Sequence, residues 1–171
     1  MTINLFSTYA KLFFLSLFFG LLFTSCGDDE EVSECEGLAV ISSDLMMNGS
    51  SASLSIAQLL VSDAFDETSY QFQIAGTLDC EELKTASFVI TIPSGESIDG
   101  TYNFVDFFSA GAGDSHGSIF NQNLTTLSQS SSDIDSGSVT VTENGESNFT
   151  LDISAQPVQG ATLEMELTHQ F

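Results

Sequence analysis

The chain has almost no basic side chains. Lys and Arg together number 2 among 171 residues, against 24 Asp and Glu, and the formal net charge is −22. Nucleic-acid-binding proteins neutralise phosphates with Lys and Arg, and basic clusters of the same residues recognise anionic lipid head groups. The composition therefore excludes a nucleic-acid partner and a basic lipid-binding patch. The charge favours solubility, and diffuse attraction of divalent cations is the alternative interpretation.

Tryptophan is absent, tyrosine occurs 3 times and histidine 2 times. With so few rings for stacking sugars, a glycan platform is disfavoured. His116 and His169 lie too far apart in sequence for a zinc-binding spacing. His116 stands beside Asp114 and Ser115, but a Ser-His-Asp site needs groups that converge from a rigid scaffold, so a solvated loop histidine is expected. A carboxylate pair for glycoside hydrolysis could be chosen anywhere among 24 acids, so a hydrolase ranks low.

The longest apolar run lies close to the N-terminus. It extends from Leu12 to Phe23, interrupted only by Ser16 and Gly20, and Lys11 precedes it. A membrane-spanning helix needs about 20 apolar residues, whereas the apolar core of a signal peptide needs about 7–15. Residues 1–25 are therefore predicted to be a signal peptide that is removed.

The residues at the end of this run, Phe23-Thr24-Ser25-Cys26, resemble the lipobox of bacterial lipoproteins. Phe23 stands where leucine is usual, as in the degenerate lipoboxes of Bacteroidota-type lipoproteins. The resemblance implies that Cys26 becomes the lipidated first residue. Two or more acyl chains anchor a protein stably without crossing the membrane. The alternative is an ordinary secreted protein with a cysteine near its cleavage site.

Residues 26–37 are predicted to form an acidic tether. The stretch "GDDEE" follows Cys26 and resembles the surface-export signals of Bacteroidota lipoproteins. This resemblance implies an outer-membrane, lipid-anchored location facing the cell exterior, with a periplasm-facing location as the alternative. Lys84 is the only basic residue after Cys26, so the side-chain charge of the mature chain is 1 − 24 = −23.

The chain contains 3 cysteines, Cys26, Cys35 and Cys80. An odd cysteine in an exported protein needs an explanation, and lipidation of Cys26 supplies one. We therefore expect a Cys35–Cys80 disulfide, as an oxidising envelope compartment allows.

Residues 38–171 are predicted to form a single all-β domain. Apolar and polar residues alternate over 70–74, 86–92, 139–141, 149–153 and 163–167. Asn144-Gly145 between two such runs predicts a hairpin turn, because both turn residues must accept a positive φ. Residues 57–61 fit either a short helical turn or a bulged strand. The stretches at 109–118 and 130–138 are predicted to be loops.

The spacing of these runs favours an antiparallel β-sandwich of about eight or nine strands, with a small lipocalin-like β-barrel as the alternative. The order of "GTY" at 100–102, "SGSVTVT" at 136–142 and Asn144-Gly145 resembles a group of all-β extracytoplasmic lipoprotein domains of Bacteroidota. The resemblance implies a β-rich extracytoplasmic domain and no catalytic residues.

One motif suggests a metal. Asp133 and Asp135, followed by Gly137, form a fragment of a calcium loop, although calcium needs six or more oxygen ligands. The alternative is an Asx-type turn, and no other cofactor is expected.

Taken together, the sequence predicts a lipid-anchored envelope protein that binds or scaffolds a protein or glycan partner without catalysis. A carrier of a small apolar ligand is the alternative, and a carboxylate-based hydrolase ranks below it.

Overall fold

The computed structural model describes residue 35 and residues 38–41, 44–145 and 147–171. The chain divides into two compact units, Met1–Val32 and Ser33–Phe171, and every described residue belongs to the second. The predicted signal peptide, Cys26 and most of the predicted tether lie outside the described residues. Among the described residues, none forms a helix long and apolar enough to cross a bilayer.

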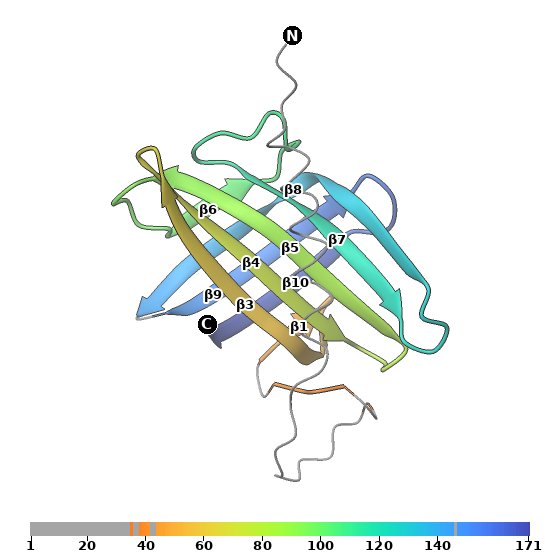
Figure 1. Cartoon of the computed structure of the whole chain (residues 1–171). Coiled ribbons are helices and arrows are strands. Elements are labelled where there is room, and N and C mark those ends of the chain that lie inside the picture. Colours follow the sequence, from red (N-terminus) through yellow and green to blue (C-terminus); the bar gives the residue numbers. More distant parts are fainter. Residues whose placement is uncertain (1–34, 36–37, 42–43, 146) are drawn as a thin grey trace. The chain divides into compact units, whose positions relative to one another are not determined.

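Ten antiparallel strands form one curled sheet in the second unit (Figure 1). Their order is β2-β1-β10-β9-β8-β7-β5-β4-β3, and β6 pairs with β8 outside this path. This arrangement confirms the predicted all-β antiparallel fold. The strands are β1 (Met46–Met47), β2 (Ser50–Ser51), β3 (Ser53–Ala64), β4 (Glu67–Thr77), β5 (Glu82–Pro93), β6 (Gly100–Asn103), β7 (Ser115–Asn123), β8 (Gln129–Gly145), β9 (Asn148–Pro157) and β10 (Leu163–Gln170).

Strand β8 belongs to both layers of the curled sheet. Its residues 129–133 pair with β7, whereas residues 134–145 pair with β9 and, in part, with β6. The register shifts between Ile134 and Ser136, and Gly137 follows with a φ of +115°. Figure 1 shows β8 passing from the layer of β3, β4, β5 and β7 to the layer of β9 and β10, whose strands cross the first layer steeply.

The prediction of a loop at 130–138 is therefore wrong. Ser, Asp and Gly favour turns because their side chains or backbones adopt non-extended conformations easily. Here the residues pair with β7 and then with β9, and this pairing overrides the local preference. The register shift near Ile134 is consistent with this preference, because a bulge is a local bend within a strand.

The core lies between the two layers and is rich in phenylalanine. Phe72 of β4 stacks on Phe88 of β5 with ring centroids 5.2 Å apart. Phe149 of β9 meets Phe72 edge-on at 6.0 Å, and Phe104 meets Phe88 edge-on at 5.9 Å. Such aromatic pairs contribute about 0.5–1.5 kcal/mol beyond their burial.

The alternation in the sequence correctly predicted most of this core. The following predicted inward residues are at most 4% exposed: Phe72, Ile74, Ala86, Phe88, Ile90, Ile92, Val139, Val141, Phe149, Leu151, Ile153, Leu163, Met165 and Leu167. Residues 57–61 continue β3 after a register shift between Leu54 and Ile56, so the bulged strand is confirmed and the helical turn is wrong.

The hairpin predicted at Asn144-Gly145 exists, but its turn lies further along the chain. Both residues belong to the end of β8, where the register shifts between Glu143 and Gly145. Gly145 pairs with Asn148, so the turn lies between these two residues. The bulge uses the conformational freedom of Gly145, whose φ is +128°.

Candidate functional site

The disulfide marks one end of the sheet. Cys35 and Cys80 are bonded with their Cα atoms 5.1 Å apart, and Cys35 is 4% exposed. Cys80 lies in the β4–β5 turn, where its N–H donates to Thr77 Oγ1 at 3.0 Å. In the same turn the N–H groups of Glu81 and Glu82 donate to Asp79, and these bonds lower the pKa of the Asp79 carboxyl. The bond joins the segment that follows Cys26 to this ordered turn.

The opposite end of the sheet carries an unusual turn. Ala64 pairs with Glu67, so Phe65 and Asp66 alone connect β3 to β4. Their φ angles are 52° and 66°, as a type I′ turn requires, and Phe65 is 100% exposed. Asn-Gly is favoured in such turns, and the β1–β2 connection uses Asn48-Gly49. A phenylalanine here carries backbone strain of about 1–2 kcal/mol without burying its ring.

Two more exposed phenylalanines lie at this end. Phe107 is 63% and Phe108 86% exposed, and both belong to the connection between β6 and β7. The Gly113 N–H in this connection donates to Thr91 O, two residues before the end of β5. Because Pro93 pairs with Glu67, the connection emerges at the same end as the Phe65 turn (Figure 1). We name Phe65, Phe107 and Phe108 the aromatic rim.

Carboxylates surround the aromatic rim. Asp63, Asp66, Glu67 and Asp106 are all exposed and lie within two residues of a rim phenylalanine. Behind the Phe65 turn, burial raises the pKa of Tyr70, and the carboxylates of Glu143 and Asp63 raise it further. The rim residues are therefore exposed apolar side chains in a strongly negative setting.

The His116 ring packs against Phe107 of the β6–β7 connection. It lies in β7 opposite Val89, half-buried, with its ring 5.0 Å from the ring of Phe107. Burial lowers the pKa of His116. The prediction of a solvated loop histidine is therefore wrong, because β7 begins at Ser115 and takes His116 into the sheet.

Asp114, Ser115 and His116 do not converge. Successive strand residues point to opposite faces, so Ser115 is fully buried on the inner face while His116 lies on the outer face. The Asp114 carboxylate instead accepts a hydrogen bond from the Gly111 N–H at 3.2 Å. This geometry separates the hydroxyl from the imidazole.

The predicted calcium ligands and His169 lie on strands. Asp133 and Asp135 are exposed and lie on β8, not in a loop. Among the described residues, no cluster of three or more His, Cys, Asp or Glu is arranged to hold a metal ion. His169 is half-buried, and its ring lies 5.2 Å from that of Phe171, which in turn meets Phe72 at 5.5 Å.

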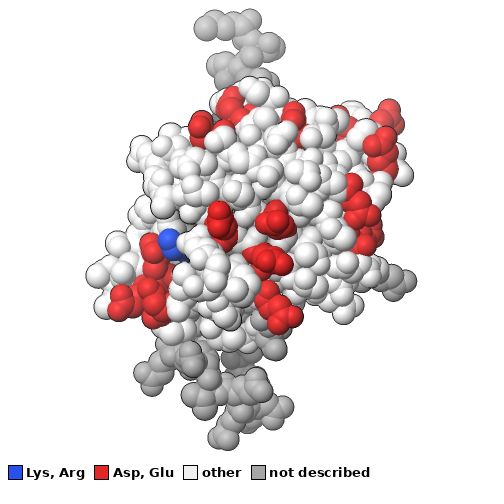
Figure 2. All heavy atoms as spheres, turned by 180° about the vertical axis from the view of Figure 1, so that it is seen from behind, with Lys and Arg blue, Asp and Glu red and all other residues white. Residues whose placement is uncertain are grey.

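Acidic side chains also gather on the outer face of β9 and β10. Glu166 pairs directly with Asp152, and Glu164 lies two residues away on the same face. Figure 2, which views the molecule from behind, shows acidic groups in the middle of this view and one basic group near its edge. Like charges directly opposite each other are destabilising, so the carboxylates on this face repel one another.

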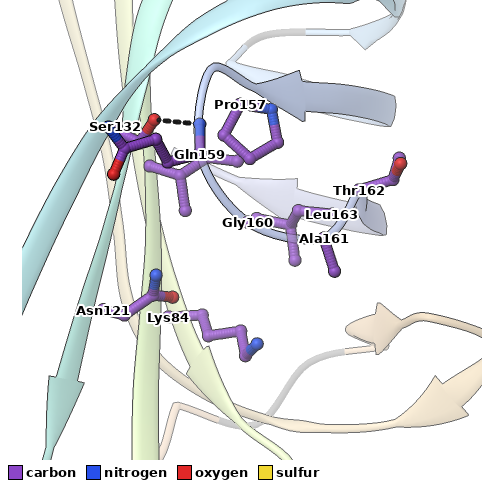
Figure 3. A pocket seen from close by; sticks show the side chains of 10 residues that line it. Lys84, Asn121, Ser132, Pro157, Gln159, Gly160, Ala161, Thr162 and Leu163 are labelled. Carbon is purple, nitrogen blue, oxygen red and sulfur yellow. Dashed lines mark hydrogen bonds between the residues drawn. The ribbon is translucent and has the colours of Figure 1, made fainter.

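A pocket lies near the disulfide end of the sheet. Lys84, Asn121, Ser132 and the β9–β10 turn line it (Figure 3), and its empty volume is about 370 Å³ including the part open to solvent. Lys84 forms an ion pair with Glu82 at 3.4 Å. The Gln159 N–H donates to Ser132 Oγ at 3.0 Å, which fixes the turn against β8.

No family model, curated protein or solved structure matches the chain.

Sequence reasoning missed the aromatic rim and the pocket. A signal for Phe65 was present, because Phe65-Asp66 stands between residues 57–61, which fit a bulged strand, and the alternating run at 70–74, but this pair is an uncommon type I′ turn. Lys84 continues the parity of Ala86 and Phe88, which could have indicated an inward-facing lysine. The partnership of Lys84 with Asn121 depends on strand pairing, and alternation within one strand does not reveal it.

Proposed function

We propose that the chain is a lipid-anchored cell-envelope protein that binds a partner protein through the aromatic rim and catalyses no reaction. The lipid on Cys26 holds one end at the outer membrane. The body presents the rim at the other end, toward the cell exterior.

Phe65 is the observation that carries this proposal. Its ring is 100% exposed, and its backbone occupies the left-handed region. Backbone strain of this kind clusters at functional sites, so the strained and exposed Phe65 supports a binding role for this side chain. Exposed aromatic residues are also the usual anchors of protein–protein interfaces.

The charge around the rim defines the partner. Asp63, Asp66, Glu67 and Asp106 would repel an acidic surface and attract a basic one. We therefore assign the rim to a protein whose surface combines basic side chains with apolar pockets for phenylalanine.

The disulfide supports the anchoring part of the proposal. Cys35 and Cys80 bond to each other, which leaves Cys26 for another role. A disulfide is typical of an exported protein. The stacked rings of Phe72 and Phe88 fill the space between the layers, which supports a packed core over a carrier for apolar ligands.

Photo-crosslinking in intact cells tests the rim. A benzoylphenylalanine at position 65 or 107 should yield one adduct with a basic protein. The same residue at Leu127, which is 68% exposed in another turn, should not. Phe108→Ser should abolish the adduct formed from position 65. An adduct of equal yield from position 127, or none from the rim, would contradict the proposal.

Anchoring has a separate test. Cys26→Ala should move the protein from the membrane fraction to the soluble fraction. Unchanged fractionation would overturn the anchor, whatever the crosslinking shows.

A further inference from the structure

Lys84 is the one Lys or Arg among the described residues, and it lies on the inner face of the sheet. It has the parity of the buried Ala86 and Phe88 on β5. Its register partner on β7 is Asn121, which has the parity of the buried Ile119. Figure 3 shows the Lys84 and Asn121 side chains next to each other, facing the β9–β10 turn.

Asn121 has an unused acceptor in this pocket. Its side-chain Oδ1 is buried and accepts no hydrogen bond from the described residues. A buried polar atom without a hydrogen-bond partner destabilises the fold. A ligand that donates a hydrogen bond to Oδ1 would relieve this destabilisation.

The positive charge of Lys84 is only weakly paired, with the carboxylate of Glu82. The Lys84 side chain is 29% exposed and Glu82 is 44% exposed, with 3.4 Å between Nζ and Oε2. Ion pairs as exposed as this one contribute little to stability, so a ligand carboxylate can displace Glu82 at little cost.

The remaining lining is mostly apolar or already hydrogen-bonded. Ile119 and Leu163 are 4% and 3% exposed and contribute an apolar wall. In the turn, Thr162 donates to the Gln156 side chain, while Ser132 accepts from the Gln159 N–H. The pocket thus offers one cation, one free acceptor and an apolar surface.

We propose that this pocket binds a small hydroxycarboxylate. The carboxylate accepts hydrogen bonds from Lys84 Nζ, the hydroxyl donates to Asn121 Oδ1, and the carbon atoms pack on Ile119 and Leu163. A simple carboxylate would leave Oδ1 unpaired. A phosphate or dicarboxylate would bring more negative charge than one lysine can offset in this acidic protein.

Titration of the isotope-labelled full chain with L-lactate tests the proposal. Amide resonances of Lys84, Asn121 and Gly160 should shift with millimolar affinity. Propanoate lacks the hydroxyl and lactamide lacks the charge, so each should bind about tenfold more weakly, a difference of about 1.4 kcal/mol. Equal binding of lactate and propanoate, or no shift with lactate, would overturn the proposal.

Three variants sharpen the test. Lys84→Met keeps the aliphatic stem and should weaken lactate binding about tenfold. Asn121→Leu should remove the preference for lactate over propanoate. Glu82→Gln frees Lys84 and should strengthen binding severalfold, which loss of folding could not produce. Unchanged affinity in Lys84→Met with an unchanged unfolding midpoint would contradict the site. These results do not depend on the anchor or the rim.

Discussion

Phe65 and Cys80 lie beyond opposite ends of the same strand, β4. Phe65 precedes Glu67, the first residue of β4, and Cys80 follows Thr77, the last. An 11-residue strand extends about 36 Å. The disulfide and the aromatic rim are therefore separated by the length of the sheet, and the anchor proposed at Cys26, nine residues before Cys35 in the sequence, would leave the rim free to meet the proposed partner.

Phe65→Asn should increase the stability of the protein. Asn tolerates the left-handed backbone far better than Phe, so the free energy of unfolding should rise by about 1 kcal/mol in urea titrations. Phe65→Ala is the control, since it removes the exposed ring but keeps the strain and should change stability little. An equal gain from both substitutions would show that the ring, not the backbone, is the source of instability.

Removal of the disulfide should be costly. Cys35 and Cys80 are 45 residues apart, and constraining a loop of this size stabilises a fold by about 4 kcal/mol in the chain-entropy model. The Cys35→Ser/Cys80→Ser variant should therefore unfold at a much lower urea concentration. Reductant should shift the native protein toward the same midpoint. A variant that unfolds at the native midpoint would show that the bond contributes nothing to stability.

Gly137 should not tolerate a side chain. Its φ is +115°, and a Cβ atom there would collide with Ser154 O. Gly137→Ala should lower the free energy of unfolding by about 2 kcal/mol or more. Gly145 is the matched control, because its φ is +128° but no atom lies within 4 Å of an added Cβ. Equal losses for the two alanine variants would mean that the close approach to β9 is not important.

His116 should make stability depend on pH. Burial lowers the pKa of the folded state below the unfolded value of about 6.5, so the unfolded state binds the proton more readily. This contribution is complete above the unfolded pKa and is lost as the pH falls toward the folded pKa.

Nuclear magnetic resonance can follow the two histidines separately. The pKa of His116 should lie below its usual value, and Phe107→Ala should raise it by exposing the ring. His116→Gln should remove the corresponding part of the pH dependence of unfolding. A His116 pKa at or above about 6.5 in the native protein would contradict the packing of Phe107 on this ring.

The sequence predicted the parts of the fold that depend on alternation within a strand. Phe88, Leu151 and Met165 are buried where the alternation placed them. Alternation says nothing of which strands pair, so the bend of β8 and its pairing with β7, β9 and β6 were not predictable. The polar stretch 130–138 resembled a loop because Ser, Asp and Gly favour turns, and its composition does not reveal that it pairs with β7 and β9.

The candidate sites were harder to predict for the same reason. The Cys35–Cys80 pair followed from cysteine counting, which needs no geometry. Lys84 and Asn121 are neighbours because β5 pairs with β7. The residues of the aromatic rim share one end of the sheet because the β3–β4 turn and the β6–β7 connection both lie there. His116 was misplaced because the glycines around it favoured a loop, whereas pairing with β5 extends β7 through Gly117 to Ser115.

Energy transfer from a labelled full-length protein to acceptor lipids in vesicles tests the central claim, an anchor at one end and a binding rim at the other. Glu67→Cys and Gln129→Cys provide exposed labelling sites at the two ends. Gln129 pairs with Gln122, which pairs with Leu83, and Leu83 lies 93 − 83 = 10 residues before Pro93, the partner of Glu67. The two sites are thus about 33 Å apart along the strands. We expect strong transfer from position 129, weak transfer from position 67, and none from either after Cys26→Ala. Stronger transfer from position 67, or transfer unaffected by Cys26→Ala, would contradict the account.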